Sequence, residues 1–145
     1  MTIAVGCDHA GYQMKKLVMQ YLWENGIEVS DCGCDGEVCD YADIAKRVCS
    51  RVQKNKDKFG ILVCGTGIGM CMSANKCKGI RAALCSEPYS AKCTRMHNDA
   101  TVLCIGSRVI GTALARDILD AFLNTEFEGG RHVVRIQKMM DLERK

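Results

Sequence analysis

Short runs of β-branched and other apolar residues alternate along the chain with longer segments in which apolar residues recur every three or four positions. This alternation is typical of a parallel sheet covered by helices, so the pattern predicts the α/β class. The apolar runs predict five strands, enough for one sheet, at Thr2–Gly6, Glu28–Asp31, Gly60–Cys64, Arg81–Cys85 and Thr101–Ile105.

Six further segments are expected to be helices. The first ends near Asn25-Gly26, a pair suited to a C-cap, and the fourth starts near Pro88, since proline is tolerated in the first helical turn. In chain order, the helices are expected at the stripe Met14, Leu17, Val18, Tyr21 and Leu22, at about Tyr41–Lys54, after Cys64, from Pro88, at the stripe Ile110, Leu114, Ile118 and Phe122, and after Gly129-Gly130.

Composition narrows the class of protein. The chain has 145 residues, of which 48% are apolar and 26% charged, with a single proline. This fits one compact domain over residues 1–145. The net charge of +3, from 20 basic and 17 acidic side chains, is too balanced for a nucleic-acid or membrane surface. We therefore expect a small-molecule partner, with no nucleic acid and no membrane.

Targeting signals also bear on the expected compartment. No run approaches the roughly 18 apolar residues of a membrane span. The start MTIAVGCDHA lacks the basic region and apolar stretch of a signal peptide. The sequence therefore predicts a cytoplasmic protein.

Eleven cysteines raise the question of disulfides or zinc. The odd count and the expected cytosolic location oppose a disulfide framework, and Cys64, Cys85 and Cys104 lie in or beside apolar runs, where cysteine behaves as a small hydrophobe. No C-x-x-C occurs, and Cys93 and His97, four apart, lack two further ligands at a recognisable spacing. We expect no metal site.

The candidate site follows from the predicted sheet. Open parallel sheets bind ligands beyond the carboxyl ends of their strands, where loops converge. Four segments are expected there: Cys7-Asp8-His9, Cys64–Gly69, Ser86-Glu87-Pro88 and Gly106-Ser107-Arg108.

The segment Cys64-Gly65-Thr66-Gly67-Ile68-Gly69 is the most informative of these. Three glycines at alternate positions let the backbone turn sharply and direct several N–H groups at one point, which predicts an anion cradle. The spacing excludes a P-loop, and Met70 stands where a dinucleotide fingerprint needs its third glycine. Cys64 precedes the cradle, where a thiolate is favoured as base or nucleophile. The alternative for the glycine-rich segment is a turn that serves only packing, and the alternative for Cys64 is one more buried cysteine.

Histidines and arginines supply the remaining candidates. Asp8-His9 and His97-Asn98 are suited to bonding sugar hydroxyls and passing a proton near pH 7, although surface histidines have similar neighbours. Arg131 and Arg135 share a helix face and should repel unless an anion, Glu128 or a phosphate, lies between them. Arg108 is a third candidate for phosphate, and ordinary surface salt bridges are the alternative.

A set of motifs along nearly the whole chain resembles the family of type B ribose-5-phosphate isomerases, with its relatives that act on allose 6-phosphate and galactose 6-phosphate. The motifs are Gly6–Gly11, Asp40-Tyr41, Cys64–Gly69, Ala74–Lys76, Gly79–Ala82, Cys85–Ala91, Arg95–Asp99, Gly106–Arg108 and Glu128–His132. The resemblance implies a three-layer α/β/α Rossmann-like fold with sheet order 2-1-3-5-4. It also implies an aldose–ketose isomerase of the non-oxidative pentose phosphate pathway, interconverting ribose 5-phosphate and ribulose 5-phosphate without metal or coenzyme.

The resemblance also implies a role for each candidate residue. Cys64 would move a proton between C2 and C1, Thr66 would help to activate it, and His97 would assist opening of the furanose ring. Some relatives use an acid in place of the cysteine, and Met70 at the corresponding position favours the cysteine-base subgroup. The other expected contacts are sugar oxygens for Asp8, His9, Tyr41 and Asn98, the enediolate for the N–H groups of Gly65, Gly67, Ile68 and Gly69, and the phosphate for Arg108, Arg131 and Arg135.

Members of this family are homodimers or dimers of dimers whose sites borrow residues from the neighbouring subunit, so His97 and some of the arginines are expected to act across an interface. Three alternatives stay open from the sequence. One is the same chemistry on a 6-phosphate hexose. The others are a small nucleotide-dependent oxidoreductase and a non-catalytic phosphosugar sensor.

Overall fold

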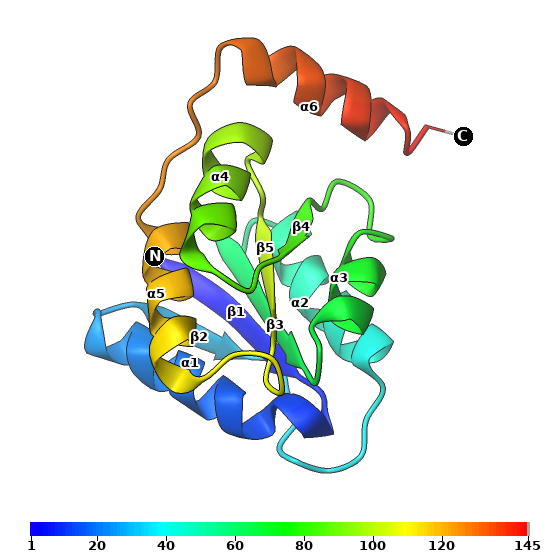
Figure 1. Cartoon of the computed structure of the whole chain (residues 1–145). Helices are drawn as coiled ribbons and strands as arrows, with labels where there is room; N and C mark the ends of the chain where they lie inside the picture. Colours follow the sequence, from blue (N-terminus) through cyan, green and yellow to red (C-terminus); the bar gives the residue numbers. More distant parts are fainter. Residues whose placement is uncertain (145) are drawn as a thin grey trace.

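A computed structural model describes residues 1–144 and shows a five-stranded parallel sheet (Figure 1). The strand order is β2-β1-β3-β5-β4, with each neighbouring pair parallel. The order implied by the family resemblance is therefore confirmed. The strands are β1 (Thr2–Cys7), β2 (Glu28–Asp31), β3 (Phe59–Cys64), β4 (Ala82–Leu84) and β5 (Val102–Gly106).

The three central strands are those with continuous apolar sequence. Every residue of β3 and β5 is buried, as expected for strands covered on both faces. The edge strands β2 and β4 are short and partly exposed. Strand β4 is shorter than predicted, with Arg81 and Cys85 outside it, and the Arg81 guanidinium donates to the carbonyls of Asn98 and Asp99.

Helices cover both faces of the sheet, giving the predicted three layers (Figure 1). Helices α1, α4 and α5 pack together on one face, and α2 and α3 on the other. A short 3₁₀ turn, η1 (His9–Gly11), precedes α1. The helices are α1 (Tyr12–Glu24), α2 (Tyr41–Gln53), α3 (Ile68–Ala74), α4 (Pro88–Asn98), α5 (Thr112–Leu123) and α6 (Arg131–Asp141).

Helix α6 lies apart from the sheet, beyond the C-terminal end of α4 (Figure 1). Of its residues only His132 is buried, while Val133 and Val134 are 53% and 60% exposed. An amphipathic helix normally buries its apolar residues. This helix therefore presents apolar side chains that its own chain does not cover.

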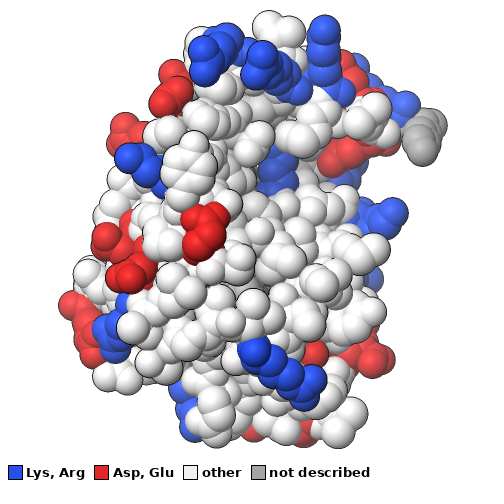
Figure 2. Space-filling model, in the orientation of Figure 1, with Lys and Arg blue, Asp and Glu red and all other residues white. Residues whose placement is uncertain are grey.

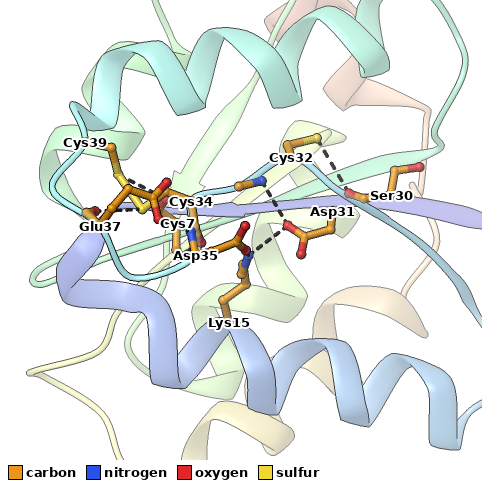
Figure 3. A network of polar contacts seen from close by, with 10 residues as sticks. Cys7, Lys15, Ser30, Asp31, Cys32, Cys34, Asp35, Glu37 and Cys39 are labelled. Carbon is orange, nitrogen blue, oxygen red and sulfur yellow. Dashed lines mark hydrogen bonds and ion pairs between the residues drawn. A yellow bond between two sulfur atoms is a disulfide. The ribbon is translucent and has the colours of Figure 1, made fainter.

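The loop between β2 and α2 folds back onto β1 (Figure 3). The N–H of Cys7 donates to the Gly33 carbonyl at 2.8 Å, and the N–H of Cys34 donates to the Cys7 carbonyl at 2.8 Å. This fold brings Cys34 and Cys39 together in a disulfide. The other nine cysteines are free, so the sequence was correct in opposing a disulfide framework but did not indicate this one pair.

The buried Lys15 anchors the same loop. Its ammonium contacts Asp31 at 2.8 Å and Asp35 at 3.4 Å (Figure 3). Separately, residues 1–144 contain no helix that combines the length and the apolar character needed to cross a bilayer.

Candidate active site

Cys64 ends β3, and its sulfur faces the loop that follows. The Gly67 N–H donates to Cys64 Sγ at 3.1 Å, and the side chain is 4% exposed. The thiol therefore points toward the backbone amide of Gly67, as the sequence led us to expect.

Gly67 takes a left-handed conformation, with φ +79°, immediately before α3 begins at Ile68. A Cβ atom at Gly67 would lie 2.4 Å from Leu84 Cδ1 and 2.9 Å from the Ile105 carbonyl carbon. Glycine is needed here for both its backbone conformation and its small size. Only glycine at position 67 lets the loop approach β5 closely enough for the Gly67 N–H to face Cys64.

Thr66 holds the loop rather than the thiol. Its Oγ1 accepts a hydrogen bond from the Ile68 N–H at 3.2 Å, and within residues 1–144 it makes no hydrogen bond to Cys64. In this conformation the hydrogen-bond partner of the Thr66 hydroxyl is therefore the Ile68 amide. The hydroxyl orders the loop that carries the amides.

Two further candidates lie against the glycines of this loop. A Cβ on Gly65 would lie 3.2 Å from Nη1 of Arg108, and one on Gly69 would lie 2.9 Å from Cζ of Tyr41. The backbone reinforces the first contact, because the Arg108 N–H donates to the Gly65 carbonyl at 2.9 Å. The structure therefore brings Arg108 and Tyr41 to the loop at Cys64.

Asp8 and His9 follow the neighbouring strand β1. The Asp8 N–H donates to the Val63 carbonyl at 3.1 Å, placing Asp8 beside the end of β3. Its Oδ1 accepts from the Ala10 and Gly11 N–H groups at 2.9 and 3.1 Å, so the carboxylate caps η1. His9 is exposed next to it. The second carboxylate oxygen of Asp8, Oδ2, takes no part in the cap.

The remaining candidates form a second cluster where α4 meets α6. A pocket of about 320 Å³ is lined by His97, Asn98, Arg131, His132, Arg135, Ile136 and Met139. The His97 and His132 rings stack with centroids 4.6 Å apart. The expected phosphate-binding arginines of α6 and the expected ring-opening histidine therefore share one pocket.

The two clusters lie at opposite ends of the sheet within one chain. Asn98 precedes β5, whereas Cys64 pairs with Gly106 at the last residue of β5. The rise along β5 alone separates the two levels by roughly 13 Å. Helix α4 runs opposite to the strands, so its last turn, with His97 and Asn98, lies at the end of the sheet where the strands begin. A single chain therefore does not bring His97, Asn98, Arg131 and Arg135 to Cys64.

Sequence reasoning missed a second distinctive thiol near this loop. A hydrogen bond with the Cys104 thiol lowers the pKa of Cys71, on α3, to about 7 against the opposing effect of burial. Burial instead raises the pKa of Cys85 to about 12. No sequence signal could separate these cysteines, because the effect depends on which thiols meet across α3 and β5. His132, to which the sequence assigned no role, could have been noticed from its spacing of four from Glu128.

Comparisons with known proteins agree with this architecture. The Ribose/Galactose Isomerase family matches residues 3–139. A protein of Escherichia coli named ribose-5-phosphate isomerase B is 46% identical over 99% of this chain and 97% of its own length. The chain belongs to the Ribose/Galactose Isomerase family.

Other members of the Ribose/Galactose Isomerase family are similar along their whole length. The solved structure of ribose-5-phosphate isomerase B from Clostridium thermocellum has a TM-score of 0.98 and 43% identity, covering 99% of this chain and 98% of that one. A protein of Pectobacterium atrosepticum named D-erythrulose-4-phosphate isomerase is 43% identical over 96% of this chain and 93% of its own length. Relatives of equal similarity therefore carry names with different sugar phosphates.

Proposed function

We propose that this protein interconverts D-ribose 5-phosphate and D-ribulose 5-phosphate through an enediolate, with Cys64 as the base. The observation that carries the proposal is the 3.1 Å hydrogen bond from the Gly67 N–H to Cys64 Sγ, in a loop that also meets Arg108 and Tyr41. A Cys64 thiolate at this position is the proton acceptor, and the amide donors belong to the loop that follows it.

The chemistry follows from this arrangement. The Cys64 thiolate takes the C2 hydrogen of the opened aldose as a proton, and the electron pair of that bond forms the C1–C2 double bond while negative charge moves to O1. Backbone N–H groups of the loop stabilise that charge. Return of the proton to C1, with loss of the C2 hydroxyl proton and protonation of O1, gives the ketose. Asp8, His9 and Tyr41 hold the sugar oxygens, and Thr66 keeps the loop in place.

We further propose that a second copy of the chain completes each site, as a homodimer or a dimer of dimers. His97 of that copy opens the furanose ring, Asn98 bonds a sugar hydroxyl, and Arg131 and Arg135 join Arg108 at the phosphate. Two observations support this: α6 leaves apolar residues uncovered, and the loop at Cys64 is flanked by exposed Ile68, Met72 and Leu84.

The charge distribution fits such an assembly. Basic side chains gather along α6, and the face around α3 and β4 carries few charges (Figure 2). An uncharged face suits contact with a second copy, and the basic helix suits a phosphate ester. Light scattering is expected to give at least twice the mass of one chain.

We place the activity in the cytosol, in one domain spanning residues 1–145. The nine free cysteines support a reducing compartment.

The deciding experiment incubates the purified protein with ribose 5-phosphate and a chelator, and follows ketose formation. Cys64→Ala is expected to lower kcat about 10²–10⁴-fold, the usual contribution of a positioned base. Cys32→Ala, at a half-buried cysteine in the loop after β2, is the matched control and should keep full activity. Undiminished turnover in Cys64→Ala would refute the assignment of the base.

The same assay separates the alternatives. Allose 6-phosphate, galactose 6-phosphate and erythrulose 4-phosphate compared with ribose 5-phosphate define the substrate by kcat/KM. Turnover only with added NAD would favour an oxidoreductase. Tight binding of the phosphosugar without turnover would favour a sensor.

A further inference from the structure

The pocket between α4 and α6 contains a group of side chains whose chemistry is that of a metal site. His97 comes from the last turn of α4, Glu128 from the segment between α5 and α6, and His132 from the first turn of α6. Their potential ligand atoms all lie within 4.8 Å of one another. The backbone holds the group in place, because the Glu128 N–H donates to the Met96 carbonyl at 3.1 Å.

An unpartnered buried nitrogen points into this group. His132 is 5% exposed, and its Nε2 has no hydrogen-bond partner. The nearest carboxylate oxygen, Glu128 Oε2, lies at 3.4 Å without hydrogen-bond geometry. Buried polar atoms are nearly always satisfied by protein, water or an ion. A cation held between Glu128 and His132 would satisfy both atoms.

We propose that His97, Glu128 and His132 form a site for a Zn²⁺-class divalent cation. Two imidazole nitrogens and one carboxylate oxygen are a common zinc ligand set that leaves one coordination position open. Zinc–nitrogen bonds of about 2.0–2.1 Å require the three ligand atoms to approach more closely than they do here. Glu128 is half exposed and His97 only partly buried, so both can turn toward His132. His97 then leaves its stacked position.

The metal acts as an inhibitor. Zinc on His97 removes the lone pair that a proton-transferring imidazole needs, and its presence between α4 and α6 restricts the pocket that holds Arg131 and Arg135. This consequence rests on the proposed function, whereas metal binding itself does not. Because substrate and zinc both engage His97 in this pocket, they compete for it.

Calorimetry with Zn²⁺ tests the binding step. The wild-type chain is expected to hold one zinc ion in this pocket, and Glu128→Gln and His132→Gln to weaken it at least about tenfold, as loss of a ligand requires. Glu126→Gln removes an exposed acid two residues from Glu128 and is the matched control with unchanged affinity. Thermal melts show whether His132→Gln is folded, and Glu128→Gln, at a half-exposed position, tests the site independently of the core.

The nine free cysteines require a control of their own, since thiolates also bind zinc. Co²⁺ in place of Zn²⁺ should give visible ligand-field bands without a sulfur-to-metal charge-transfer band, and these bands should be lost in Glu128→Gln. Equal zinc affinity in wild type and both variants, or a spectrum dominated by sulfur ligands, would overturn the proposal.

Inhibition is measured separately. Zn²⁺ is expected to inhibit ketose formation, with reversal by a chelator and relief by excess ribose 5-phosphate. Zinc binding without inhibition would refute the competition, and failure of the proposed isomerase activity would leave the calorimetric result to decide the metal site alone.

Discussion

The close approach of Gly67 to β5 can be tested by one methyl group. In Gly67→Ala the backbone must keep φ near +79°, which costs roughly 1–2 kcal/mol for a residue with a Cβ. The new methyl would also lie 2.4 Å from Leu84 Cδ1 and 2.9 Å from the Ile105 carbonyl carbon. Leu84 can move, but the Ile105 backbone cannot, and such overpacking adds about 1–3 kcal/mol. The free energy of unfolding should fall by about 2–5 kcal/mol in total.

Gly79 provides a matched control for the backbone contribution. It has φ +77°, and a Cβ there would meet nothing within 4 Å. Gly79→Ala should therefore lose only the roughly 1–2 kcal/mol of left-handed strain. Urea unfolding of both variants separates the two effects. Equal losses would refute the argument that the loop approaches β5 too closely for a side chain.

The same substitution tests the role of the amide. Relief of the clash must move the loop, and with it the N–H that donates to Cys64 Sγ. Loss of one donor of this kind lowers kcat about 10²–10³-fold. Full turnover in a folded Gly67→Ala variant would show that this amide does not serve the reaction.

Three further substitutions or modifications test the rest of the structure. The methyl group of Gly65→Ala would lie 3.2 Å from Arg108 Nη1 and should displace that side chain. The KM for the phosphate ester should rise with little change in stability, because the arginine side chain can move; an unchanged KM would contradict this. Lys15→Met should cost roughly 1–2 kcal/mol in urea unfolding, since the Lys15 side chain is 1% exposed but those of its aspartate partners are 38% and 79% exposed. Lys16→Met, at the exposed neighbour, should cost almost nothing. Cys71, with a pKa lowered to about 7, should be about half thiolate at neutral pH. Its alkylation by iodoacetamide should therefore rise from pH 6 to 8 and then level off. An alkylation midpoint near pH 9 would refute the lowered pKa.

The central sheet could be predicted from sequence because burial on both faces leaves an unbroken apolar run. Strands β1, β3 and β5 are the clearest examples, each matching its expected position to within one or two residues. Strand β4 was less well predicted, since Arg81 and Cys85 lie outside it and only three residues pair as strand. A short edge strand carries too few residues for periodicity to define its ends.

The candidate site was predictable only in part. Residues at or just beyond the carboxyl end of a strand, such as Cys64, Asp8 and Arg108, could be grouped because parallel strands end at one edge. His97 and Arg131 lie on α4 and α6 at the opposite edge of the sheet. Helical periodicity carries no information about how far they lie from Cys64. The Cys34–Cys39 pair was also hidden, because its formation depends on how the loop folds back against Cys7.

In the dimer proposed above, each site takes Cys64 from one chain and His97, Arg131 and Arg135 from the other, so two differently damaged chains are expected to rescue each other. A preparation of Cys64→Ala would lack the proposed base in every site, and one of Arg131→Ala would lack a proposed phosphate ligand in every site. After subunit exchange in an equal mixture, half of the proposed dimers would pair one chain of each kind, and each mixed dimer would regain one undamaged site. We therefore expect about a quarter of wild-type turnover. Sites built within single chains would give no such recovery.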